Sequence, residues 1–108
     1  MGMIYQGVSP GAKTAEYVFE LSTEQKQASV HQVGIEPSNG ATGTVAVSVR
    51  ASGRTTYEPV TDNGVAVVVD VAESRAVRIF GAVDAIKLTP TGISGGETFT
   101  PTFSGWED

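Results

Sequence analysis

The chain has no cysteine among its 108 residues, which excludes disulfide scaffolds and thiolate metal sites. It also has little charge: Asp, Glu, Lys and Arg make up 18% of it, against roughly a quarter of an average globular chain. Its 7 basic residues are scattered and are outnumbered by 12 acidic ones. A duplex-binding domain concentrates Lys and Arg on one face, so we expect no nucleic-acid partner.

Long apolar runs are missing as well. The longest, Val65–Val69, is far too short to cross a bilayer, so we expect no membrane partner. The first residues, Met1–Gly7, carry no basic segment and no apolar run of signal-peptide length. The sequence therefore predicts a protein that is made in the cytoplasm and is not exported by a standard signal peptide.

Side chains suited to chemistry are sparse. His31 is the only histidine, and Glu36 is the nearest acidic residue along the chain, so no group of nucleophile, base and orienting acid is recognisable. Glu16 and Glu20 share one face of an expected strand, which is not a cleft that could hold a sugar. The segment Asp62–Gly64 lacks the oxygen ligands and closing Glu of a calcium loop. We therefore expect no enzyme activity, no cofactor and no metal.

The dominant pattern is period-two alternation of apolar and polar residues, which is typical of strands. Tyr17, Phe19 and Leu21 fall on one face, opposite Glu16 and Glu20. The same alternation recurs in Val45–Ala51, Val65–Val71, Val77–Ile79, Ile86–Leu88 and Phe99–Phe103. Val65–Val71 is partly apolar on its second face too, which favours a central strand buried on both sides. No apolar stripe at helical spacing follows Ser22–Gln27, so that segment is expected to be a polar loop with at most one helical turn.

Turn residues separate these runs. Asn39-Gly40 and Asn63-Gly64 suit tight hairpins, and Gly92–Gly96 supplies a further turn. Pro59 and Pro101 lie inside strand-like stretches and predict strands that are edges or carry bulges, and such edges are where we first expect a partner. The sequence therefore predicts an all-β, single-domain antiparallel β-sandwich or jelly-roll-like barrel of seven to eight short strands over residues 1–108. Residues 1–13 form a candidate N-terminal arm, which either pairs as a first strand or engages a neighbour.

Without a reaction centre, we expect the molecule to work through loops and edges that contact other molecules. The candidate protein-contact residues lie in the arm, in turns and among the few aromatics: Ile4, Tyr5, Asn39, Tyr57, Asn63 and Trp106. Trp106 has two interpretations, the favoured one a plug at one end of the core and the other an intermolecular anchor. A glycan-binding module usually exposes more aromatics than this chain offers.

The stretch from Ser74 to Gly92, SRAVRIFGAVDAIKLTPTG, resembles small β-rich virion structural proteins of tailed bacteriophages. In those proteins a strand ending in glycine leads to a similar "vDAIkltPtG" strand, then to glycine-rich turn residues and a last Thr-rich strand, here Ile93–Thr100. The resemblance covers about the last third of the chain and supplies no active-site residues.

The resemblance implies a capsid decoration (cement) protein that sits on the virion surface and holds the head shell together. Its partners would be the major capsid protein or other virion proteins, and it would form a homodimer or homotrimer. A tail, neck or head-fibre component is the alternative within the same group of proteins. A glycan-binding β-sandwich module is the alternative from another class.

Overall fold

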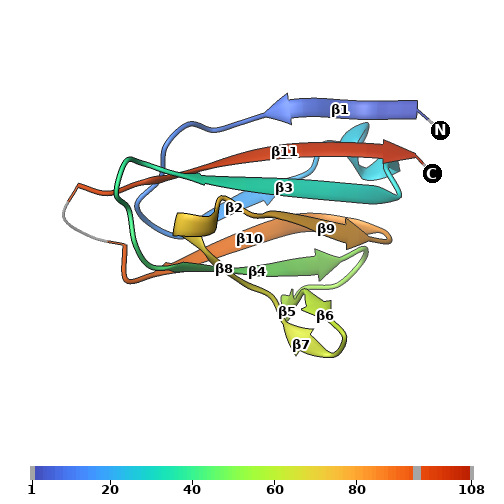
Figure 1. Ribbon diagram of the computed structural model, residues 1–108. Helices are drawn as coiled ribbons and strands as arrows, with labels where there is room; N and C mark the ends of the chain where they lie inside the picture. Colours follow the sequence, from blue (N-terminus) through green and yellow to red (C-terminus); the bar gives the residue numbers. More distant parts are fainter. Residues whose placement is uncertain (1, 94–95, 108) are drawn as a thin grey trace.

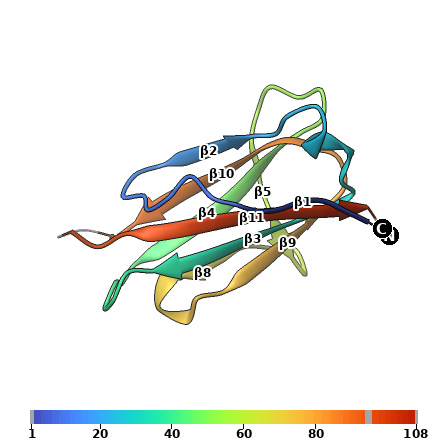
Figure 2. The ribbon, with the colours of Figure 1, turned by 90° about the horizontal axis from the view of Figure 1, so that it is seen from above.

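In the computed structural model, which describes residues 2–93 and 96–107, two antiparallel sheets pack face to face (Figures 1 and 2). Sheet A has the order β1 (Gly2–Val8), β11 (Phe99–Glu107), β3 (Val30–Pro37) and β9 (Ala76–Phe80). Sheet B has the order β2 (Tyr17–Glu20), β10 (Val83–Thr91), β4 (Thr44–Ala51) and β5 (Glu58–Pro59), and β8 (Val68–Asp70) also pairs with β4. A separate hairpin joins β6 (Thr61–Asp62) to β7 (Val65–Ala66).

The chain path is that of a jelly roll. When the run from β5 to β8 is taken as one position, the chain has eight positions, and successive positions alternate between the sheets except at the centre, where β4 and the run from β5 to β8 both lie in sheet B. The first strand pairs with the last (β1 with β11), the second with the next to last (β2 with β10), and β3 with β9. Such pairing rolls one long antiparallel hairpin into a sandwich. The predicted all-β antiparallel sandwich is therefore confirmed.

The core lies between the sheets, where the alternation places it. Phe19 from β2 stacks on Phe103 from β11 with ring centroids 4.1 Å apart, and Tyr17 tilts against the same ring. Phe99 and Phe103 are fully buried. Glu16 and Glu20 are exposed, as predicted. Apolar residues of Val45–Ala51, Val77–Ile79 and Ile86–Leu88 also face this core, so the alternation identified its residues correctly.

The segment Val65–Val71 departs from the prediction. It forms two short pieces, β7 and β8, and β8 pairs only with β4 at the border of sheet B. Val65 and Val68 are consequently 68% and 49% exposed. The prediction of a central strand buried on both faces is wrong, because the chain turns into the β6–β7 hairpin before it can enter the sheet.

The predictions for the two prolines that lie in strands, Pro59 and Pro101, have different outcomes. Pro59 lies in β5, an edge strand, as predicted. Pro101 lies in β11, between β1 and β3, so its strand is not an edge; the two register shifts in the pairing of β11 with β1 agree with the alternative of a strand that carries bulges. The nitrogen of Pro101 faces the side of β1, whose pairing with β11 ends at Val8, and the Ser9 hydroxyl donates to the Pro101 carbonyl instead (2.7 Å). No ladder hydrogen bond is therefore lost.

The turns and the arm complete the path. Asn63-Gly64 forms a two-residue hairpin with φ of 53° and 80°, as predicted. Asn39-Gly40 instead joins β3 of sheet A to β4 of sheet B, so it is not a hairpin turn. Within the expected turn Gly92–Gly96, Ser94 and Gly95 lie outside the described residues. The arm folds back as β1 on β11, which settles its two alternatives in favour of a first strand.

Helical structure in the described residues is limited to two 3-10 turns, η1 (Gln25–Gln27) and η2 (Val71–Glu73). The turn η1 agrees with the polar loop expected there. Across residues 2–93 and 96–107, no helix has the length and apolar character needed to cross a membrane.

Candidate functional site

The outer face of sheet B carries an ion-pair network. Ala85 of β10 lies in register between Glu20 of β2 and Arg50 of β4. Its small side chain lets the two flanking residues meet above it, and the Arg50 guanidinium donates to both Glu20 carboxylate oxygens at 3.0 and 3.2 Å. The paired Glu20 raises the pKa of Arg50. This bidentate geometry satisfies the charges of both side chains within the chain itself.

Tyr57, a predicted contact residue, belongs to the same network. Its hydroxyl accepts from the Arg50 guanidinium at 3.3 Å. The Lys87 ammonium lies 4.2 Å from its ring centroid, and Arg50 lies 5.7 Å from it. The hydroxyl and the ring of Tyr57 are thus both engaged by cations of this face.

The outer face of sheet A is different, because apolar side chains cross it. Met3, Trp106, Val30 and Phe80 are direct cross-strand neighbours on β1, β11, β3 and β9, and we call them the apolar row. Met3 and Phe80, at its two ends, are 56% and 72% exposed. Trp106 is half-buried, and Val30 is covered by the side chains around it although it lies outside the core cluster. One line of apolar side chains therefore spans the full width of the sheet.

An arginine borders the apolar row. The Arg78 guanidinium lies 5.5 Å from the ring centroid of Trp106, and its Nε donates to the Gln32 side chain at 3.3 Å. Trp, Phe, Met and Arg are the residue types that enrich protein–protein interfaces, and Trp and Arg the ones that dominate their binding energy. The composition of this face therefore fits a protein-contact surface better than that of sheet B.

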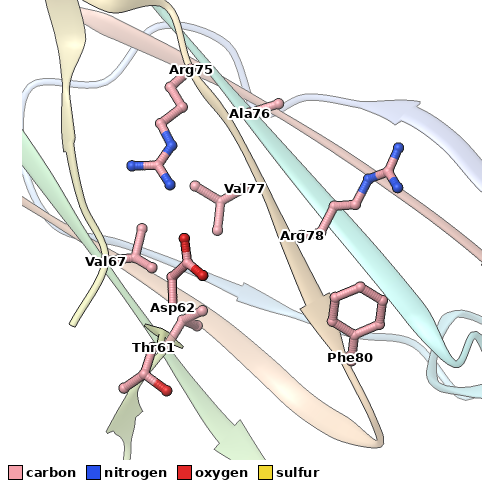
Figure 3. Close-up of a pocket in the computed structure, with 9 residues that line it drawn as sticks. Thr61, Asp62, Val67, Arg75, Ala76, Val77, Arg78 and Phe80 are labelled. Atoms are coloured by element: carbon pink, nitrogen blue, oxygen red, sulfur yellow. The ribbon is translucent and has the colours of Figure 1, made fainter. Parts of the chain in front are cut away.

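A groove adjoins the row on the side of β9. It lies between β9 and the β6–β7 hairpin and has a volume of about 230 Å³ (Figure 3). Val67 and Val77 face each other across it, with Asp62 and Arg75 nearby. Phe80 belongs to both the groove and the apolar row, so the two form one continuous surface.

The structure does not gather the predicted contact residues at one place. Trp106 lies on the outer face of sheet A, so its favoured interpretation as a core plug is wrong. Asn63 is exposed at the tip of the β6–β7 hairpin. Asn39 is exposed in the β3–β4 turn, at the end of the sandwich away from the C-terminus (Figure 1). Tyr57 lies in the loop before β5, beside Arg50 of sheet B, and Ile4 packs partly against the core.

The prediction that Tyr5 contacts a partner is wrong, because its side chain is only 8% exposed. Its hydroxyl hydrogen-bonds the Nδ1 atom of His31, which is fully buried, at 2.6 Å. Tyr5 lies opposite Gly105, and a Cβ atom at Gly105 would fall 2.3 Å from the Tyr5 ring. The absent side chain of Gly105 thus provides the space that draws Tyr5 into the core.

Sequence reasoning missed Met3, Val30 and Phe80. One indication was present: Val77 and Ile79 alternate inward, which leaves Phe80 on the wet face of its strand. The alignment of the row depends on the register of four strands that are distant in sequence. That register is visible only in the folded chain.

Neither a metal-binding cluster nor a similarity to a known protein identifies the site. Among the described residues, no three side chains of His, Asp or Glu gather where they could hold a metal ion. The chain has no match among protein-family models, curated proteins or solved structures.

Proposed function

We propose that the protein is a structural virion protein of a tailed phage, and that it decorates the head shell and stabilises it. The apolar row on sheet A carries this proposal, because Met3 and Phe80 at its two ends are large apolar side chains that stay exposed in the described part of the chain. The outer face of sheet A would lie on the shell, with the major capsid protein as its partner. The outer face of sheet B, with its internally paired charges, would face the solvent.

The exposed ends of the row supply a source of binding energy. Burying a side chain such as Met3 or Phe80 contributes roughly 1.5–3 kcal/mol relative to leaving it in water. That is modest for one molecule, but a shell offers many symmetric sites. A homodimer or homotrimer at a lattice junction would engage several of them at once, and such multivalent binding raises the overall affinity without new contacts.

Two further observations support the proposal. The jelly roll is an architecture used by viral capsid domains as well as by lectins. The stretch that resembles phage virion proteins, Ser74–Gly92, forms β9 and β10, and β9 carries Phe80 and borders the groove. The strand β9 thus belongs both to the stretch that resembles phage virion proteins and to the proposed contact surface.

A glycan-binding role fits the surface less well. Sugars stack on the open faces of aromatic rings, and the two candidate rings both have cations placed over them. Arg78 lies over Trp106, while Arg50 and Lys87 lie over Tyr57. A sugar would have to displace these contacts before it could stack.

Co-sedimentation with undecorated capsids tests the proposal. We expect the intact protein to bind, Phe80→Ser to bind at least about tenfold more weakly, and Val65→Ser to bind like the intact protein. Val65 is the matched control because it is 68% exposed but lies outside the apolar row. Absence of capsid binding by the intact protein would contradict decoration, and binding to purified tails instead would support the tail or neck alternative. A glycan-array hit lost in Trp106→Ala would support the glycan-binding module.

A further inference from the structure

The four outer edges of the two sheets are not equally protected against added strands. Natural sheets shield their edges with bulges, prolines, charges or very short strands. The pairing of β1 with β11 has two register shifts, and β5 has two residues, one of them Pro59. The strand β2 has four residues and ends in the charged Glu20. Three of the edges thus carry such devices.

The fourth edge, β9, has only one of these devices, the charged residue Arg78. It pairs with β3 through five consecutive residues in unbroken register and contains no proline. The Ile35 amide donates to the Arg75 carbonyl, and the Gly81 amide donates to the Ser29 carbonyl. Because hydrogen-bonded pairs alternate along an antiparallel ladder, the backbone groups of Ala76, Arg78 and Phe80 point away from β3. No strand of the described residues pairs with them.

The one charged side chain of β9 does not cover this edge. Arg78 extends over the face of sheet A, where it contacts Trp106 and Gln32. Figure 3 shows it directed away from the groove, toward β3. The edge therefore presents a row of unpaired N–H and C=O groups that repeats every two residues. An extended polypeptide matches that repeat, whereas a sugar or a nucleic acid does not.

The groove beside β9 is bounded on both sides, which favours a single chain segment as its occupant. The β6–β7 hairpin stands on its other side, and Thr61 and Asp62 line the same cavity as β9. A second folded sheet approaching the edge would meet this hairpin, while one extended strand would fit between it and β9. Val67 and Val77 form the floor of the groove and are only 6% and 4% exposed, so main-chain pairing with β9 rather than apolar contact would hold such a strand.

We infer that β9 accepts an extended segment of a partner protein as an added strand in this groove. The segment would pair its main chain with Ala76, Arg78 and Phe80. Only the identity of the partner rests on the proposed function: it would be an extended arm of the shell protein. The proline-containing strands predicted from the sequence to meet a partner are less suited, because proline lacks the N–H that an added strand needs.

Substitutions at Ala76 isolate the backbone contribution. Ala76 is the first residue of β9, where proline is tolerated, and its N–H points toward the groove. Ala76→Pro removes that donor without breaking the ladder to β3, and Ala76→Ser is the matched control that keeps it. We expect Ala76→Pro to weaken capsid binding about tenfold and Ala76→Ser to leave it unchanged.

A second arm of the experiment does not depend on capsids. A synthetic peptide copying residues 30–36, the sequence that pairs with the other edge of β9, serves as the probe at about 1 mM. We expect the amide NMR signals of Arg78 and Phe80 to shift and to exchange more slowly in the intact protein and in Ala76→Ser, and not in Ala76→Pro. Unchanged amides at this concentration would overturn strand addition. Peptide binding without capsid binding would instead overturn only the proposed function.

Discussion

The buried pair of Tyr5 and His31 gives a prediction with a defined magnitude. Tyr5→Phe removes the 2.6 Å hydrogen bond to His31 Nδ1. Among the described residues the Nε2 atom of His31 has no hydrogen-bond partner, so the variant removes the one side-chain hydrogen bond of a fully buried ring. Leaving a buried polar group unsatisfied costs about 1–3 kcal/mol, and we expect the free energy of unfolding at pH 8 to fall by that amount.

The same pair determines how stability changes in acid. Burial lowers the pKa of His31, an effect that the backbone of Ala28 partly opposes. In the unfolded chain His31 gains a proton as the pH falls through about 6.5, whereas the folded chain keeps it neutral to lower pH. The unfolded state then binds more protons, so the free energy of unfolding decreases below about pH 6.5.

At high pH, the dependence of stability on pH comes from Tyr5. Burial raises its pKa to about 12. Above about pH 10 the unfolded chain loses a phenolic proton that the folded chain keeps, so stability falls as the pH rises from about 10 to 12. A difference of about two pKa units corresponds to about 2–3 kcal/mol. Tyr5→Phe removes this contribution and should flatten the alkaline decrease.

Urea unfolding followed by tryptophan fluorescence, repeated from pH 5 to pH 11, measures both effects. Tyr17→Phe is the control, because Tyr17 is half-buried against the core. We expect the control to lose less than about 0.5 kcal/mol, as substitutions away from special features do. Equal losses in the two variants, or an alkaline decrease that persists in Tyr5→Phe, would refute the assignment of a specific Tyr5–His31 bond.

Three further predictions follow from single residues. Gly105→Ala places a Cβ against the Tyr5 ring, and we expect the free energy of unfolding measured in urea to fall by about 1–3 kcal/mol. An unchanged free energy of unfolding would contradict this close packing. Gly43→Ala places a Cβ 2.7 Å from the backbone oxygen of Thr91 at a φ of 111°, so we expect a larger loss than for Gly105→Ala, measured as the drop in thermal midpoint. Phe80→Ser should change the thermal midpoint little, because the ring is 72% exposed, while a marked loss would show that Phe80 stabilises the fold.

Much of the fold was predictable because strand alternation and burial have the same physical cause. Tyr17, Phe19 and Leu21 alternate in the sequence since one face of β2 meets the core. The predictions failed where the outcome depended on a neighbouring strand. Pro101 is tolerated in an inner strand because the pairing of β1 ends at Val8, before it reaches Pro101, which no local pattern reveals.

The contact surface was less predictable for the same reason. Trp106 was identified as a candidate, but its neighbours in the apolar row come from three other strands. Tyr5 was expected at a surface because it lies in the candidate N-terminal arm, yet Gly105 opens a space for it in the core. Both outcomes depend on cross-strand register, which is set by the whole sandwich.

Hydrogen–deuterium exchange of the protein free and bound to undecorated capsids tests the central claim most directly. The account predicts that protection appears on binding in β9 and at the end of β11 around Trp106, and that β2 and β10 stay unchanged. Protection confined to the outer face of sheet B, around Glu20 and Arg50, would contradict the assignment of sheet A as the contact face.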